Sequence, residues 1–213
     1  MNHREIYDTV SRVIAERASR GSFRMMDLGC GNARCIAPIL RQYPPTSYQG
    51  VDLSEAALGE ATEILLGVEG VELNCSDLLG HVESAKSPWD VVFSGFAVHH
   101  LSLGEKARLF RALAAIVSTD GFFLMVDVVR DEGVSRDEHV ASYTAMMRRE
   151  WHGIPTEALE EGCAHVSGFD FPATTKELFE LAQVAGFTHA SQLCRHANHA
   201  VLLFSQRVGP FPV

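Results

Sequence analysis

Three aspartates stand at the ends of short apolar runs in the first half of the chain, and their carboxylates could bind the polar groups of a ligand. Asp27 precedes a turn with Gly29 and Gly31, Asp52 ends the second run, and Asp77 comes shortly after the third. The carboxyl ends of successive parallel strands meet at one edge of a sheet, where open α/β sheets bind ligands. We therefore expect the three acids to line one site, although an aspartate there can also cap the next helix.

The turn after the first run favours a particular kind of cofactor. Its sequence is Gly-Cys-Gly-Asn-Ala-Arg over residues 29–34, and the glycines let a ligand approach backbone N–H groups. A dinucleotide-binding turn needs Gly or Ala at its last position, where this chain has Arg34. Asp27 would repel a pyrophosphate, whereas it would attract an ammonium group. These residues favour a cofactor with a cationic end and disfavour an NAD-dependent oxidoreductase.

The other two acids suit a nucleoside. Asp52 follows Asp27 at a separation close to the roughly 20 residues typical of a ribose-binding acid. One carboxylate can accept hydrogen bonds from two ribose hydroxyls. Asp77 can accept a hydrogen bond from an adenine amino group, and Leu78 can cover the ring.

Apolar runs and helical patterns alternate along the chain, which predicts an α/β fold with a parallel sheet covered on both faces. Only residues 195–198 separate the last two runs, which predicts an antiparallel hairpin. Strands are expected at 23–28, 47–51, 71–75, 89–93, 122–129, 188–194 and 199–205. Helices are expected at 3–20, from Asn32 to about Gln42 with a kink at Pro38, at 54–66, from Ser102 to Val117 and at 174–185.

Residues 130–172 interrupt this alternation and predict one or two inserted helices. An addition at the ligand edge of an α/β sheet often shapes the pocket above it, so the segment is expected to cover a substrate. Its apolar side chains could equally form a satellite core. They are Met146, Met147, Trp151, Phe169 and Phe171.

Length and composition fit one globular domain over residues 1–213. The chain has 46% hydrophobic and 21% charged residues, and its net charge of −9 argues mildly against a nucleic-acid partner. Five cysteines without C-x-x-C spacing, and late histidines without i, i+4 pairs, predict neither disulfides nor a metal. No run approaches the roughly 20 apolar residues of a membrane helix. Without a readable signal peptide, a cytoplasmic protein with no membrane partner is expected.

Four segments in the same order resemble the class I S-adenosylmethionine-dependent methyltransferases. They are Met-Asp-Leu-Gly-Cys-Gly at 26–31, Gly-Val-Asp-Leu-Ser at 50–54, Ser-Asp-Leu at 76–78 and Asp-Val-Val-Phe-Ser-Gly-Phe-Ala-Val-His-His-Leu at 90–101. The resemblance covers about residues 20–129, and the final hairpin fits that family as well. It implies a three-layer, Rossmann-like fold whose seven-stranded sheet is mostly parallel, with an antiparallel last strand and a helical insertion after strand five.

The resemblance also implies S-adenosylmethionine as the cofactor and assigns residues to its parts. Ala33 stands where the family often has a third glycine, and the helix at 3–20 would close over the cofactor. The implied cofactor-binding residues are Asp27, Gly29 and Gly31 for the methionine part, Asp52 for the ribose, Asp77 and Leu78 for the adenine, and Ser94 and Phe96 beside the sulfonium, with Leu53 as a further cofactor contact.

The expected reaction is methyl transfer to a small-molecule nucleophile by in-line displacement, for which the protein supplies position and desolvation. A nucleophile that must lose a proton needs a general base, and His99 of the pair His99-His100 is the candidate. Adjacent side chains usually point different ways, so at least one of the pair could make structural hydrogen bonds instead. Asp127, near the end of the fifth strand, could contact the substrate or cap the next segment of the chain.

Two alternatives stay open. The chain could methylate RNA or protein, which would need a basic or extended docking surface. It could also be a non-catalytic module that binds the cofactor, which an exposed apolar patch on the insertion would favour. The sequence is compatible with a monomer and with a homodimer.

Overall fold

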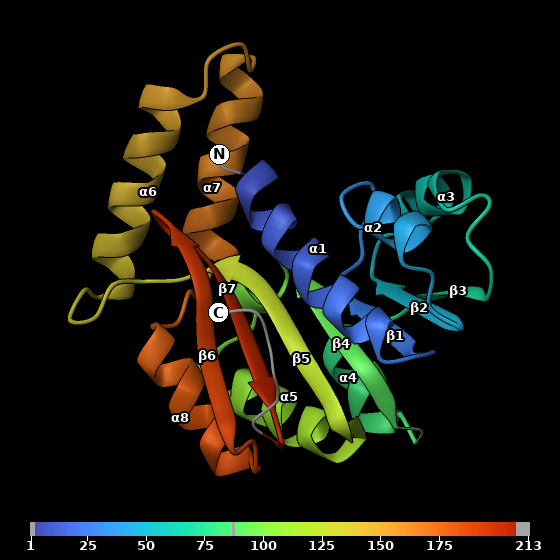
Figure 1. Cartoon of the computed structure of the whole chain (residues 1–213). Coiled ribbons are helices and arrows are strands. Elements are labelled where there is room, and N and C mark those ends of the chain that lie inside the picture. Colours follow the sequence, from blue (N-terminus) through green and yellow to red (C-terminus); the bar gives the residue numbers. More distant parts are fainter. Residues whose placement is uncertain (1–2, 87, 208–213) are drawn as a thin grey trace.

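The computed structural model describes residues 3–86 and 88–207, in which strands and helices alternate. Figure 1 shows the sheet at the centre, with helices α6 and α7 beyond the carboxyl end of β5. The strands are β1 (Arg24–Leu28), β2 (Ser47–Asp52), β3 (Val71–Cys75), β4 (Trp89–Gly95), β5 (Val117–Val128), β6 (His189–His196) and β7 (His199–Ser205). The helices are α1 (His3–Ser19), α2 (Ala37–Gln42), α3 (Glu55–Ile64), α4 (Leu78–Ser84), α5 (Leu103–Ile116), α6 (Arg136–Glu150), α7 (Thr156–Phe169) and α8 (Thr175–Ala185), with a 3₁₀ turn, η1 (Val98–His100), before α5.

The seven strands form one sheet in the order β3-β2-β1-β4-β5-β7-β6. Strand β1 pairs in parallel with β2 and β4, β2 pairs with β3, and β4 pairs with β5. Strand β7 lies antiparallel between β5 and β6, so the fold prediction is confirmed, including the antiparallel last strand. The strand order reverses at β1, which places a ligand crevice at the carboxyl ends of β1 and β4.

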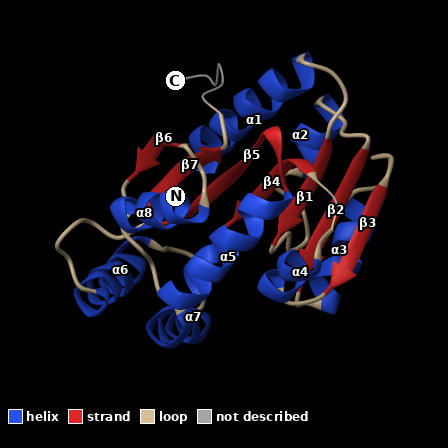
Figure 2. Cartoon of the chain, turned by 90° about the horizontal axis from the view of Figure 1, so that it is seen from below, coloured by secondary structure: helices blue, strands red, loops and turns tan. Residues whose placement is uncertain are grey.

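Both faces of the sheet are apolar because helices cover both. On β5, Phe122, Leu124 and Val126 pack on the side of α1 and α2, whereas Phe123 and Met125 pack on the side of α5 and α8. Figure 2 shows α1 on one side of the sheet and α5 and α8 on the other. The alternation follows from the side-chain period of two in a strand, and each large side chain so buried contributes about 1.5–3 kcal/mol.

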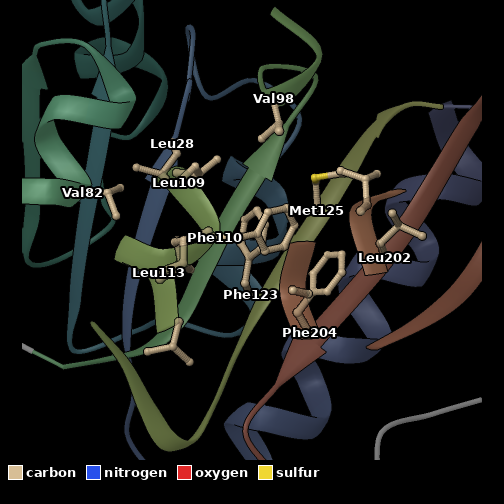
Figure 3. Close-up of a cluster of buried hydrophobic side chains, with 14 of the residues drawn as sticks. Leu28, Val82, Val98, Leu109, Phe110, Leu113, Phe123, Met125, Leu202 and Phe204 are labelled. Atoms are coloured by element: carbon tan, nitrogen blue, oxygen red, sulfur yellow. The ribbon is translucent and has the colours of Figure 1, made fainter. Parts of the chain in front are cut away.

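An aromatic cluster anchors α5 on the sheet. Phe110 of α5 meets Phe123 of β5 and Phe204 of β7 edge-on, with ring centroids 5.9 and 5.0 Å apart. Phe123 and Phe204 stack on each other at 5.7 Å, and Figure 3 shows the three rings together. Val98 belongs to the same core, so this packing also positions η1, which carries the histidine pair.

Several helix ends agree with the sequence-based prediction. Ser54 caps α3 by accepting a hydrogen bond from the N–H of Ala57. Ser102 and Thr174 begin α5 and α8 with capping boxes, in which a glutamate three residues later bonds back to the cap. Gly186 ends α8 with a φ of 109°, a left-handed conformation that glycine adopts without strain.

The predicted start of the second helix is wrong. Helix α2 begins at Ala37, because Gly29, Gly31 and Ala33 have φ values of 71°, 52° and 57°, which no right-handed helix contains. Pro38 lies in the first turn of α2, where its missing N–H is not needed, so it begins the helix and does not kink it.

Two further features differ from the sequence-based expectation. The patterns do not predict α4, which begins directly after Asp77. Strand β5 begins at Val117, before the expected start at residue 122, because Val117 pairs with Trp89 across an irregular register. Neither difference moves a residue away from the carboxyl edge of the sheet.

The segment between β5 and α8 forms the pair α6 and α7, as predicted for residues 130–172. The two helices lie side by side beyond the end of β5 (Figure 1). Tyr143, Met147 and Cys163 are buried between them, so the pair has a satellite core of its own. Phe169, in contrast, is 61% exposed. Among the described residues, no helix is both long enough and apolar enough to cross a membrane.

Candidate cofactor site

A cavity of about 650 Å³ opens at the carboxyl ends of β1, β2 and β4. Its walls are the turn after β1, the residues that follow β2 and β3, and the segment after β4, while Tyr7 of α1 closes one side. The volume lies within the roughly 300–1,000 Å³ of small-molecule sites. The predicted cofactor residues that line it are Asp27, Gly29, Gly31, Asp52, Leu53, Asp77, Leu78 and Phe96.

The turn between β1 and α2 brings the backbone close to this cavity. A Cβ at Gly29 would lie 2.3 Å from the Cβ of Ala97, so no larger residue fits there. The N–H of Gly31 donates to Oδ2 of Asp52 at 2.7 Å, which ties the turn to the end of β2. Ala33 has a left-handed φ, a conformation that costs a residue other than glycine roughly 1–2 kcal/mol. This agrees with its position, where the methyltransferase pattern often has a third glycine.

Asp27 is a buried acid in the wall of the cavity. It is 2% exposed, and its Oδ2 accepts a hydrogen bond from the Tyr48 hydroxyl at 2.8 Å. Its Oδ1 is buried without a hydrogen-bond partner. Burial raises the pKa of Asp27 to about 7, the Tyr48 hydrogen bond opposes the rise, and the charge of Asp52 adds to it. A cationic group in the cavity would pair with the unpaired Oδ1 and would lower the free-energy cost of burying the ionised carboxylate.

Tyr48 is a site residue that sequence reasoning missed. It lies in β2, opposite Met25 of β1, and is fully buried. Its hydroxyl reaches Asp27 only because the two strands pair in this register. The one signal in the sequence is a phenol inside an apolar strand, since a buried hydroxyl needs a hydrogen-bond partner.

Asp52 and Asp77 line the cavity and also accept hydrogen bonds from nearby backbone N–H groups. Oδ1 of Asp52 accepts from the N–H of Ser54 at 2.9 Å, in addition to the bond from Gly31. Oδ2 of Asp77 accepts from the N–H of Gly80 at 2.6 Å and caps α4. The capping alternative therefore holds at Asp77, whereas Ser54 caps the helix after Asp52. Each carboxylate retains acceptor capacity for a ligand, because an ionised carboxyl offers about four lone-pair sites.

The segment after β4 forms the opposite wall. Phe96 lines the cavity with a φ of 58°, which is uncommon for a bulky residue. The structure does not bring Ser94 to the cavity: it is fully buried, and its hydroxyl donates to the carbonyl of Leu28 at 2.8 Å, tying β4 to β1. Gly95 and Ala97 line the cavity beside Phe96.

The two adjacent histidines point in different directions. His100 lines the cavity, and its side chain is 41% exposed. His99 is buried and lies behind the cavity wall, where its Nδ1 is 2.5 Å from Oδ1 of Asp127 and its backbone N–H donates to Oδ2. Desolvation lowers the pKa of His99, but the charge and hydrogen bond of Asp127, together with Asp170, outweigh it and raise the pKa. Asp127 therefore holds the orientation of the His99 ring.

Known sequences and structures agree with this architecture. A methyltransferase domain family matches residues 26–123. Over 92 residues the chain is 33% identical to trans-aconitate 2-methyltransferase of Acidovorax sp. (strain JS42), and to that of Acidovorax ebreus (strain TPSY). The alignment covers 42% of this chain and 34% of the relative, so the match spans about a third of the relatives' length.

Solved methyltransferase structures share the fold over nearly the whole chain. An O-methyltransferase family protein from Burkholderia thailandensis has a TM-score of 0.70 at 17% identity, covering 97% of this chain and 56% of that one. Human N-acetylserotonin methyltransferase has a TM-score of 0.65 at 15% identity, covering 98% and 52%. The fold and the cavity at the strand reversal define a Rossmann-like α/β protein. Residues 26–123 match a methyltransferase domain family, and the fold is that of solved S-adenosylmethionine-dependent methyltransferases.

Proposed function

We propose that the chain binds S-adenosylmethionine in the cavity at the strand ends and transfers its methyl group to a small molecule. The observation that carries this proposal is Asp27, whose buried Oδ1 has no hydrogen-bond partner although the residue lines the cavity. The ammonium group of the cofactor's methionine part would donate to this oxygen in a charge-assisted hydrogen bond. The methyltransferase domain at 26–123 supports the same assignment.

Each wall of the cavity would hold one part of the cofactor. The glycine-rich turn after β1 lets the methionine part come close to the backbone, and the acids after β2 and β3 offer acceptors to the nucleoside. The residues proposed for these roles are Asp27, Gly29 and Gly31 for methionine, Asp52 and Leu53 for ribose, Asp77 and Leu78 for adenine, and Phe96 for the sulfonium, with Ser94 fixing the end of β4 beneath it.

A second cavity, of about 460 Å³, supports a small-molecule substrate on the side of the insertion. Met146 and Trp151 line it from the insertion, and His199 lines it from β7. The ring of His199 meets the ring of Phe96 edge-on at 5.4 Å, and Phe96 lines the cofactor cavity. The contact between these two rings therefore links the wall of the second cavity to the wall of the cofactor cavity. The segment 130–172 would thus cover the substrate, within a single domain over residues 1–213.

The bound cofactor supplies an activated methyl group, so the chain's own residues position the acceptor, exclude water and take up any proton. We assign the uptake of this proton to His99. Asp127 occupies its Nδ1, which leaves Nε2 as the nitrogen that can act as a base. An unchanged turnover in His99→Ala would exclude this role.

We propose a small-molecule substrate because similar proteins are named for small methyl acceptors. Trans-aconitate is the first acceptor to test, because the sequence relatives are named for it. The net charge of −9 disfavours RNA as the acceptor. Five unpaired thiols support a reducing compartment, and we propose the cytoplasm.

Calorimetry of S-adenosylmethionine binding tests the cofactor assignment. We expect micromolar binding and a loss of about tenfold or more in Asp52→Ala, which removes the acceptor of the Gly31 N–H and of the ribose. The matched control is Asp120→Ala at the opposite end of β5, an exposed acid paired with Arg207, which should keep the affinity. The absence of binding by the unmodified protein, or an equal loss in the control, would contradict the proposal.

Release of S-adenosylhomocysteine in the presence of candidate acceptors tests the activity. A methylated small molecule supports the proposal. Methylation confined to RNA or protein would favour the macromolecular alternative. Tight cofactor binding with no product from any acceptor class would favour a non-catalytic module.

A further inference from the structure

The adjacent histidines and one acid from the insertion form a cluster beside the cofactor cavity. His99 and His100 come from η1, and Asp170 directly follows α7. One ring nitrogen of each histidine and a carboxylate oxygen of Asp170 all lie within 4.8 Å of one another. His100 also lines the cofactor cavity, so the cluster stands at its rim.

The distances in this cluster are not those of a hydrogen-bonded network. Oδ2 of Asp170 lies 3.7 Å from Nε2 of His99, which is too long for a hydrogen bond. Oδ1 of Asp170 lies 3.2 Å from Nδ1 of His100, yet it is buried without a hydrogen bond of acceptable geometry. Asp170 is only 6% exposed. A buried carboxylate in this state requires a further partner.

The same distances fit the donor atoms of a bound divalent ion. Zinc binds imidazole nitrogen and carboxylate oxygen at about 2.0–2.2 Å, which at tetrahedral angles separates neighbouring donor atoms by about 3.3 Å. The separation of 3.2 Å between Oδ1 of Asp170 and Nδ1 of His100 is close to that value, and one ligand atom from each of the three residues lies within 4.8 Å of the other two.

The surroundings of the cluster also fit a metal site. A metal-binding histidine usually donates its other ring N–H to a carboxylate, and Asp127 lies 2.5 Å from Nδ1 of His99. This contact leaves Nε2 of His99 for an ion.

We propose that His99, His100 and Asp170 form a binding site for a divalent transition-metal ion, such as Zn²⁺ or Fe²⁺, at the rim of the cofactor cavity. Two imidazoles and one carboxylate suit these ions, whereas Mg²⁺ and Ca²⁺ prefer all-oxygen sites. Three protein ligands leave a coordination position for water or a substrate oxygen. Spacing along the chain does not predict this site, because Asp170 meets the histidines only through folding of the insertion. The proposed metal site does not rest on the proposed methyl transfer. An ion bound to Nε2 of His99 would prevent that nitrogen from acting as a general base.

Titration of the untagged, EDTA-treated protein with Zn²⁺ tests the site by calorimetry. We expect about one ion per chain and a loss of affinity of at least about tenfold in both Asp170→Asn and His100→Asn. His100 is partly exposed, so its variant should fold, and the melting temperature of each variant checks this. The matched control is His152→Asn, an exposed histidine between α6 and α7, which should bind Zn²⁺ like the unmodified protein.

Titration with Co²⁺ gives a second readout that is independent of any activity. The unmodified protein should gain visible absorption typical of protein-bound cobalt, and both cluster variants should lose it. No binding by the unmodified protein would overturn the proposal. Binding that both variants retain would overturn it as well, because the ion would then occupy another site, such as the exposed Cys35 or Cys75.

Discussion

Asp27 should make cofactor binding depend on pH. Its pKa of about 7 in the folded protein, against 3.8 for an ordinary aspartate, means that ionising it costs about 4 kcal/mol. The folded state therefore holds this proton more tightly than the unfolded state. The resulting contribution to stability is fully present below about pH 4, falls as the pH rises towards 7, and is lost above that value.

A bound ammonium group should reverse this preference, because it pairs with the ionised carboxylate. Below pH 7 the protein must then release a proton to bind S-adenosylmethionine. We expect the affinity to rise about tenfold per pH unit between about pH 5 and 7 and to level off above. Calorimetry in two buffers with different heats of ionisation should count close to one proton released per cofactor in this range.

The Asp27→Asn variant should separate binding from stability. Its cofactor affinity should be low and without the pH slope, while the ligand-free protein at pH 8 should gain up to about 4 kcal/mol, because no charge is buried. Each 1 kcal/mol corresponds to roughly 2–4 °C in the melting temperature of a chain of this size. Methylthioadenosine, which lacks the ammonium group, should bind the unmodified protein without the slope. A constant affinity for S-adenosylmethionine from pH 5 to 7, or a slope that persists in the variant, would refute the reasoning.

Three further predictions concern stability and are read by thermal melting. Gly29→Ala should destabilise the protein by about 1–3 kcal/mol and weaken cofactor binding, since its Cβ would meet the Cβ of Ala97 at 2.3 Å. The control is Gly59→Ala in α3, where a Cβ meets open space, and it should stabilise the protein by about 0.5–1 kcal/mol. The same change in stability in both variants would contradict a steric clash at Gly29. Thr174→Ala should cost about 1 kcal/mol through loss of the α8 cap, and an unchanged melting temperature would show that the cap contributes nothing. Phe110→Ala should cost about 3–5 kcal/mol because it empties the aromatic cluster under α5, whereas a loss under 1 kcal/mol would mean that the core closes over the gap.

Local sequence determined much of the fold because the deciding interactions lie within a few residues. Ser102 and Thr174 accept bonds from N–H groups three residues later, so the starts of α5 and α8 can be read from the chain. The continuous apolar run of β5, which is buried on both faces, and the short turn before β7 likewise predict strands and a hairpin. The start of α2 could not be read in this way, because it depends on three left-handed residues in a turn shaped by its contact with Asp52.

The positions of the acids at the carboxyl edge were also determined by sequence, since each strand ends where its apolar run ends. Tertiary structure alone decided which groups stand opposite them. Asp27 finds Tyr48 through the register of β1 and β2, Ser94 turns into the core to hold Leu28, and Asp170 reaches the histidine pair through the folding of the insertion. Periodicity tells which face of a strand is buried. The partner on that face comes from distant parts of the chain, and only the packed structure brings the two together.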